Sequence, residues 1–211
     1  MTGEFDTDVL IVGAGPAGLG LACDLARRGV GRRIVDQQQT PLQASRGKGV
    51  QPRTLELFED LGMLDAFLEV SAPYPVIRLM KGDTMIQERR LNEMIAPTSD
   101  IPYPNMIMAA QWRTDEVLRK AYGKLGGEVE NGVALTAFEQ TAQGVTAILE
   151  RDGETSKVRA RYLVGADGGR SLVRTSLGID FPGETLESAR MLEWRSGDII
   201  LISRMQLSRL H

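Results

Sequence analysis

Short apolar runs alternate with a longer amphipathic segment at the start of the chain. Residues 8–12 form an apolar, largely β-branched run that stops at a glycine, which predicts a buried parallel strand. Apolar positions then recur at helical spacing over residues 16–28, and Gly29 marks a helix end. Residues 33–36 predict a second strand. This order indicates a βαβ unit with parallel strands and a right-handed crossover.

The middle of the chain is less regular. Residues 37–51 are polar and contain glycine, so we expect a loop, followed by short helices over residues 52–59 and 64–70. A proline-punctuated stretch comes next, and it contains a predicted hairpin of residues 76–80 and 84–88.

The second half begins with a predicted helix over residues 114–125, which would place Asp115 and Glu116 in its favourable first turn. Three runs of alternating polarity follow and predict an antiparallel meander: residues 133–138, 145–150 and 155–160. Residues 162–166 predict a further buried strand that leads into Asp167.

Composition narrows the class of protein. The 211 residues include 25 Lys and Arg against 28 Asp and Glu, a net charge of −3 that argues against a nucleic-acid or anionic-membrane partner. The single cysteine, Cys23, excludes an internal disulfide and a multi-cysteine zinc site. His211 is the single histidine, so a histidine-based triad and a multi-histidine metal centre are also excluded.

The hydropathy of the chain and its first eight residues favour a cytoplasmic protein. No apolar stretch reaches the ~18 charge-free residues of a membrane span, and residues 1–8 are acidic where a secretory signal is basic. We therefore expect a soluble protein of a reducing compartment, with no metal.

The clearest motif is glycine-rich and joins the first predicted strand to the helix after it. Its sequence is Gly13-Ala14-Gly15-Pro16-Ala17-Gly18. In this context Gly13 makes the tight turn, Gly15 lets the backbone approach a pyrophosphate, and Gly18 allows close packing of helix and sheet. Backbone N–H groups at the helix start would hold the anion.

Asp36 ends the second predicted strand, 18 residues after Gly18. A carboxylate there accepts the hydroxyl hydrogens of an adenosine ribose and repels a 2′-phosphate. The glycine loop and Asp36 together predict an ADP-containing dinucleotide, and they leave FAD and NAD both open.

A second cluster, residues 162–174, again combines a strand, a tight turn and a helix start. Its Asp-Gly-x-x-Ser-x-Val-Arg pattern, from Asp167 to Arg174, resembles the single-component flavoprotein aromatic hydroxylases, the para-hydroxybenzoate and phenol hydroxylase group. Three more segments resemble the same group, the last of them its polyketide and chlorophenol hydroxylase branch: residues 45–56, 111–116 and 181–184.

The resemblance implies FAD as the cofactor and assigns residues to it. Gly13, Gly15, Pro16, Ala17 and Gly18 would lie at the pyrophosphate, and Asp36 at the adenosine ribose. Arg46 would reach the cofactor from its loop, Gln111 would bond the ribityl or pyrophosphate region, and Asp167 would bind the flavin side chain. Arg174 would anchor the turn that holds Asp167, and Ser171 would cap a helix.

The implied reaction is an NAD(P)H-dependent monooxygenation. In this family NADPH or NADH reduces the flavin, O2 adds to it, and the flavin hydroperoxide transfers one oxygen atom to an aromatic or polyketide-like substrate. The cofactor carries the reaction, so we assign no catalytic side chain.

The expected fold is α/β, a Rossmann-like FAD-binding domain of the glutathione-reductase type with a parallel sheet and an antiparallel meander. We divide it into residues 1–71 and 111–192 for FAD, residues 72–110 as a partial substrate-binding insertion, and residues 193–211 as a divergent tail. The family's downstream Gly-Asp motif is missing, and we interpret Gly197-Asp198 as an unrelated occurrence.

Two alternatives follow from this reading. The first is a truncated, catalytically inactive FAD-binding fragment, because family members are longer and residues 193–211 resemble nothing in them. The second is an NAD-binding dehydrogenase module, for which the glycine loop alone would suffice. The Asp167 cluster argues against the second.

Overall fold

A computed structural model describes residues 5–41, 49–90 and 93–183 of the chain. Its centre is a six-stranded sheet in which four neighbouring strands are parallel and the last two are antiparallel. In spatial order the strands are β8 (Val129–Asn131), β2 (Arg32–Asp36), β1 (Thr7–Val12), β11 (Glu154–Gly165), β10 (Gly144–Arg151) and β9 (Ala134–Thr141). The predicted βαβ unit and meander are confirmed.

The longest strand, β11, joins the two halves of the sheet. Its first half pairs antiparallel with β10, and its second half pairs parallel with β1. Ala160 lies at the junction and is the register partner of both Thr7 and Val145. The sequence pattern predicted two strands here, at residues 155–160 and 162–166, but Arg161 continues the extended backbone between them.

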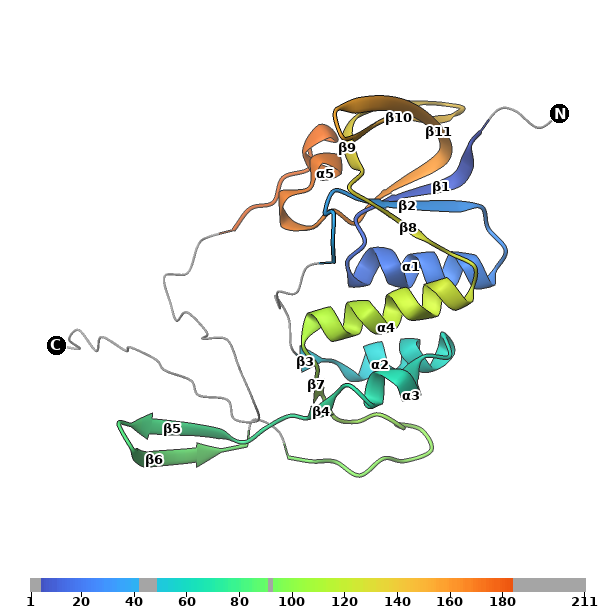
Figure 1. Ribbon diagram of the computed structural model, residues 1–211. Helices are drawn as coiled ribbons and strands as arrows, with labels where there is room; N and C mark the ends of the chain where they lie inside the picture. The colour runs from blue at the N-terminus through green and yellow to red at the C-terminus, as the bar shows by residue number, and fades with distance from the viewer. Residues whose placement is uncertain (1–4, 42–48, 91–92, 184–211) are drawn as a thin grey trace.

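Helices cover one face of the parallel strands, and the curled meander covers the other (Figure 1). Helices α1 (Pro16–Arg27) and α4 (Gln111–Lys124) pack side by side under the sheet, and α2 (Pro52–Asp60) and α3 (Leu64–Leu68) lie beyond them. The short helix α5 (Leu172–Ser176) follows a 3-10 turn, Gly168–Arg170, on the meander side.

The side chains of β1 point alternately to the two faces of the sheet, and both faces are covered. Val9 and Ile11 point into the cluster formed with α1 and α4, whereas Leu10 and Val12 point into the cluster formed with the meander. Leu10 and Ile11 have no exposed surface, and burying each such side chain contributes roughly 1.5–3 kcal/mol. The two faces of one strand thus belong to two hydrophobic cores.

Helix α4 begins three residues earlier than the pattern predicted, at Gln111 rather than at residue 114. Ala110 occupies its N-cap position and no side chain caps it, so the sequence carries no start signal. Asp115 and Glu116 therefore lie in the second turn, and the expectation that they stabilise the helix dipole from the first turn is wrong.

Residues 72–110 leave the main body and return to it through a small three-stranded sheet. Its strands are β3 (Gly49–Val50), β7 (Ile107–Met108) and β4 (Ala72–Pro73). Beyond this neck, β5 (Ile77–Lys81) and β6 (Thr84–Arg89) form the predicted hairpin, which projects away from the other elements (Figure 1).

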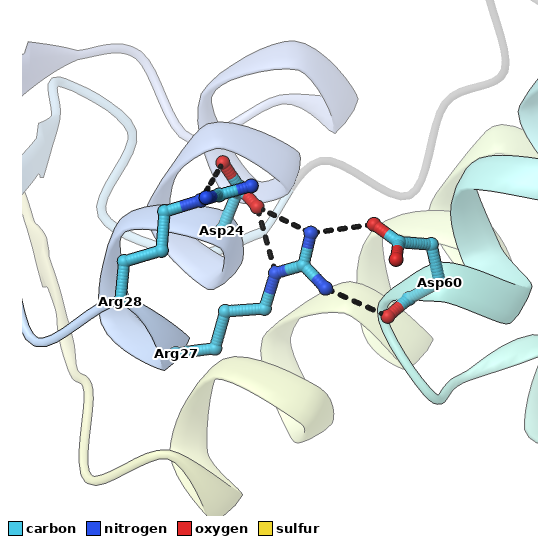
Figure 2. A network of polar contacts seen from close by, with 4 residues as sticks. All are labelled: Asp24, Arg27, Arg28 and Asp60. Atoms are coloured by element: carbon cyan, nitrogen blue, oxygen red, sulfur yellow. Dashed lines mark hydrogen bonds and ion pairs between the residues drawn. The ribbon is translucent and has the colours of Figure 1, made fainter.

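An ion-pair network joins the carboxyl ends of α1 and α2 (Figure 2). Arg27 donates to Asp24 at 2.7 Å and to the Asp60 backbone carbonyl at 2.9 Å, and it also pairs with the Asp60 carboxylate. Arg28 donates to the other oxygen of Asp24 at 3.0 Å. Hydrogen bonds to the guanidinium groups lower the pKa values of Asp24 and Asp60. This network fixes the end of α1 that lies opposite the glycine turn.

None of the helices within the described ranges combines the length and apolar character needed to cross a membrane.

The side chain of Cys23, on α1, is buried against α4, and its thiol faces the Leu118 carbonyl oxygen at 3.7 Å. Burial raises its pKa to about 11, so the thiol is neutral at physiological pH.

Candidate functional site

A cleft of about 440 Å³ opens where β1, β2 and β11 end. The glycine turn after β1, the turn after β11 and one face of α4 form its walls, together with the segment after β2 and the start of β9. The carboxyl edge of a parallel sheet is where open α/β folds bind their ligands. The cleft is therefore the candidate site.

Gly13 and Gly18 are required by the backbone. Gly13 has a φ of +105°, and a Cβ atom there would lie 2.3 Å from the Ala166 carbonyl oxygen. A Cβ on Gly18 would lie 1.9 Å from the carbonyl oxygen of Gly13. The lack of a Cβ at both positions allows β1, α1 and the turn after β11 to approach this closely, as expected for the first and third glycines of the motif.

Gly15 differs from the other two because a Cβ there would meet no atom within 4 Å. Gly15 is the extended N-cap of α1, Pro16 follows it, and no side chain caps the helix. The N–H groups in the first turn of α1 therefore have no capping side chain, and Gly15, Pro16 and Ala17 line the cleft at this helix start. An open backbone edge with uncapped N–H groups fits an anionic pyrophosphate.

Asp36 is held in place at the end of β2 by two backbone donors. Its Oδ2 accepts the Ala14 N–H at 2.7 Å, and its Oδ1 accepts the Gln38 N–H at 2.8 Å. A carboxylate has about four acceptor sites, so each oxygen retains capacity for a further donor. Asp36 thus couples the glycine turn to the end of the cleft where a ribose is expected.

Asp167 is turned toward the start of α5. Its Oδ1 accepts the Ser171 hydroxyl at 2.6 Å, and its Oδ2 accepts the Leu172 N–H at 2.7 Å. Ser171 is the N-cap of α5 and accepts the Arg174 N–H at 2.9 Å, while the Arg174 guanidinium donates to the Gly169 carbonyl at 2.9 Å. The predicted cap at Ser171 and anchor at Arg174 are confirmed.

The face of α4 contributes two cleft residues that the sequence analysis did not select. Gln111, Asp115 and Arg119 are spaced four residues apart and all line the cleft. Burial raises the pKa of Asp115 to about 6, against the opposing effects of Arg119 and a hydrogen bond from Gln111. The i, i+4, i+8 spacing from Gln111 would have identified Asp115 and Arg119, had the helix start been placed correctly.

The remaining predicted positions lie elsewhere. Arg46 and Gly197-Asp198 fall outside the described residues. A second hollow of about 400 Å³, between Tyr74, Arg90 and Met106 among others, lies within residues 72–110 and shares no lining residue with the cleft.

Comparison with known proteins identifies the class of protein that this fold and cleft define. The chain belongs to the FAD binding domain family, whose profile matches residues 6–207. This match decides for FAD between the two dinucleotides that the glycine loop left open. It also extends through residues 193–207, which the sequence pattern alone set apart as a divergent tail.

Two of the relatives are monooxygenases. A flavin-dependent monooxygenase of Mycobacteroides abscessus is 43% identical over 87% of this chain and 40% of its own length. The 6-methylpretetramide 4-monooxygenase of Streptomyces rimosus is 38% identical over 92% of this chain and 33% of its own length. The resemblance drawn from the motifs is confirmed at the level of the family.

Solved structures agree with this family. Aklavinone-11 hydroxylase, determined with FAD and aklavinone, superposes with a TM-score of 0.70 at 32% identity, over 84% of this chain and 36% of that one. The flavin-dependent monooxygenase PieE, determined with FAD and substrate, has a TM-score of 0.73 at 28% identity. The chain spans 33% to 40% of the length of the relatives described above.

Proposed function

We propose that the cleft binds FAD, with the pyrophosphate at the glycine turn and the adenosine at Asp36. Gly13 and Gly18 shape the turn, and Gly15, Pro16 and Ala17 form the edge on which the anion lies. The observation that carries this assignment is the open, uncapped edge at Gly15, beside a carboxylate already oriented by two backbone bonds. Gln111 bonds the ribityl or pyrophosphate region, Asp167 binds the flavin side chain, and Arg46 is a further cofactor-binding residue.

We further propose that the complete protein is an NAD(P)H-dependent monooxygenase that hydroxylates an aromatic or polyketide-like substrate. When bound, FAD supplies the activation of O2 and the oxygen transfer. This chain's residues bind and orient the cofactor; the role of residues 72–110, with their second hollow, is to contribute to the substrate layer. The relatives named above support this reaction class by their activities.

The proposed setting is the cytoplasm, where NAD(P)H is available. The proposed partners are small molecules, the aromatic substrate and O2, rather than a nucleic acid or a membrane. The net charge of −3 supports this choice because it provides no basic surface excess.

The first test is the visible absorbance spectrum of the purified chain, before and after titration with FAD. A bound-flavin spectrum with saturable binding is expected. A chain that stays colourless and gains no flavin signal would refute FAD binding by these residues alone. Consumption of NADPH with phenolic substrates then tests the reaction, and a chain that binds FAD without consuming NADPH would be the inactive FAD-binding fragment.

A further inference from the structure

Arg119 places a positive charge on the wall of the cleft. It lies on α4, about two turns after Gln111, and its side chain is half-buried. Within the described ranges its guanidinium makes one hydrogen bond, from Nη1 to the Asn131 Oδ1 atom at 3.4 Å, which is long for an N–H···O bond. The buried Nε atom has no partner there. A guanidinium has five N–H donors, so the protein satisfies little of its capacity.

Two other arginines of this region have well-defined protein partners. Arg33, on β2, donates to both carboxylate oxygens of Glu130, at 2.8 Å and 2.9 Å. Arg32 lies over the Tyr122 ring, with its guanidinium carbon 5.5 Å from the ring centroid. Among the residues that the structure describes, Arg119 has neither an ion pair with a carboxylate nor an aromatic ring beneath it. Its charge is therefore not used to hold the fold together in the way that the charge of Arg33 is.

Asp115, one turn before Arg119 on the same helix, does not neutralise it. Asp115 Oδ1 is buried without a hydrogen-bond partner in the described part of the chain, and the two side chains form no ion pair there. A half-buried charge without a counter-charge costs stability. Proteins accept such a cost at sites where a ligand supplies the missing partner. Because Arg119 lines the cleft, the cleft is where that partner would bind.

The order of the strands shows which end of the cleft Arg119 occupies. Neighbouring strands β1, β2 and β8 end at the glycine turn, at Asp36 and at Asn131. Asn131 is the register partner of Asp36, and Arg119 contacts Asn131. Arg119 therefore lies beyond Asp36 on the side away from the glycine turn. With the pyrophosphate at the glycine turn and the ribose at Asp36, the adenosine end of the dinucleotide faces Arg119.

We propose that Arg119 is a further cofactor-binding residue, whose guanidinium donates to acceptor atoms of the adenosine half of the dinucleotide. The ribose oxygens and the ring nitrogens of adenine are such acceptors, and a planar guanidinium with several N–H groups suits them. Asp36 and Arg119 then have complementary roles, because the carboxylate accepts from the ribose hydroxyls and the guanidinium donates. This inference rests on the proposed function, because it takes the cleft as the dinucleotide site.

Titrations with FAD and with ADP, which share the adenosine half, test the assignment. Arg119→Gln should weaken the binding of both ligands about tenfold, the worth of one charge-assisted hydrogen bond. The matched control is Lys120→Gln, which makes the same charge change at the next position, where Lys120 is exposed and pairs with Glu116 at 2.7 Å. Its affinities should equal those of wild type. Wild-type ADP affinity in Arg119→Gln, or an equal loss in Lys120→Gln, would overturn the proposal.

Urea denaturation without ligand distinguishes a binding role from a structural one. Arg119→Gln removes an unpaired charge, so its unfolding midpoint should equal or exceed that of wild type. Arg33→Gln loses the ion pair with Glu130, and its midpoint should fall. A midpoint of Arg119→Gln that falls as far as that of Arg33→Gln, or a variant that does not fold, would assign Arg119 to the fold and overturn the inference.

The same titrations separate this inference from the proposed function. A wild-type chain that binds ADP but not FAD would refute the FAD assignment, and a tenfold loss of ADP affinity in Arg119→Gln would still support the role of Arg119. A wild-type chain that binds both ligands, with unchanged affinities in Arg119→Gln, would refute the role of Arg119 alone. A wild-type chain that binds neither ligand would refute both.

Discussion

Two strand–turn–helix units face each other across the cleft, and they use their helix starts in opposite ways. In the first unit, β1 leads through the glycine turn into the twelve-residue helix α1, whose start has no capping side chain. In the second, β11 leads into the five-residue helix α5, whose first N–H groups are bonded by Asp167 and Ser171. The same local design therefore gives one open and one closed helix start.

The difference supports the proposed anion site at the start of α1 rather than at the start of α5. Uncapped N–H groups at the end of a helix favour a negative charge, whereas the carboxylate of Asp167 already occupies that position on α5. A pyrophosphate would be repelled by Asp167 if it approached α5 directly. Asp167 instead stiffens the turn against which Gly13 packs.

The largest expected effect comes from Gly18→Ala, which tests whether Gly18 is needed for folding. Gly18→Ala places a Cβ atom against the Gly13 carbonyl in a contact that backbone must relieve. We expect destabilisation of at least about 3 kcal/mol and loss of FAD binding together. Chemical denaturation followed by circular dichroism measures it, and a stably folded Gly18→Ala chain would contradict the packing role of Gly18.

Gly15→Ala should separate binding from folding. Its Cβ meets no protein atom within 4 Å, so the free energy of unfolding should change little, while FAD affinity should fall about 10- to 100-fold because the methyl group occupies space next to the pyrophosphate. Flavin titration measures the loss. The matched control is Gly20→Ala within α1, where a Cβ also meets nothing and helix propensity should add about 0.5–1 kcal/mol. Unchanged affinity in Gly15→Ala would place the anion elsewhere.

Asp167→Asn tests the closed turn. The amide has one acceptor oxygen in place of two, so either the Ser171 hydroxyl or the Leu172 N–H loses its partner. We expect the free energy of unfolding to fall by about 1–3 kcal/mol and FAD affinity to fall about tenfold. Thermal unfolding with and without FAD distinguishes the two effects. An Asp167→Asn chain with wild-type affinity would confine Asp167 to capping α5.

Ser171→Ala should give the smallest effect. It removes the cap of α5 and leaves the second Asp167 bond, to Leu172, in place. The expected loss is about 1 kcal/mol of stability with FAD affinity unchanged once the chain is folded. A thermal melt and a flavin titration on the same preparation measure both, and a matching loss of affinity would mean that the α5 start itself contacts the cofactor.

The sequence predicted the elements whose signals are local. The strand before Gly13, the glycine turn, the hairpin and the meander each have a period or a turn residue within a few positions, and each appears in the structure. The role of Ser171 as a cap was also readable, because hydroxyl residues at helix starts have a specific hydrogen-bond partner.

The features that the sequence did not predict depend on distant contacts or on an unmarked boundary. β3, β4 and β7 have two residues each and exist only because segments from three parts of the chain pair. The start of α4 carries no capping residue, so Asp115 was interpreted as a dipole charge rather than a cleft residue. The hydrogen bonds that Asp167 accepts from Ser171 and Leu172 depend on the geometry of the turn, which the sequence motif does not specify.

The continuity of β11 has a consequence for the order in which the protein assembles. The meander strands are neighbours in sequence and can pair as soon as they are synthesised, whereas β1 has to wait for a partner on β11. The bond from the Arg159 N–H to the Asp6 carboxylate spans 153 residues, a measure of that delay. During translation β1 and its neighbour β2 therefore emerge well before β11, the other strand with which β1 pairs. The glycine turn, which packs on Ala166, therefore needs residues from both the beginning and the end of the described chain, and so does the proposed cofactor site.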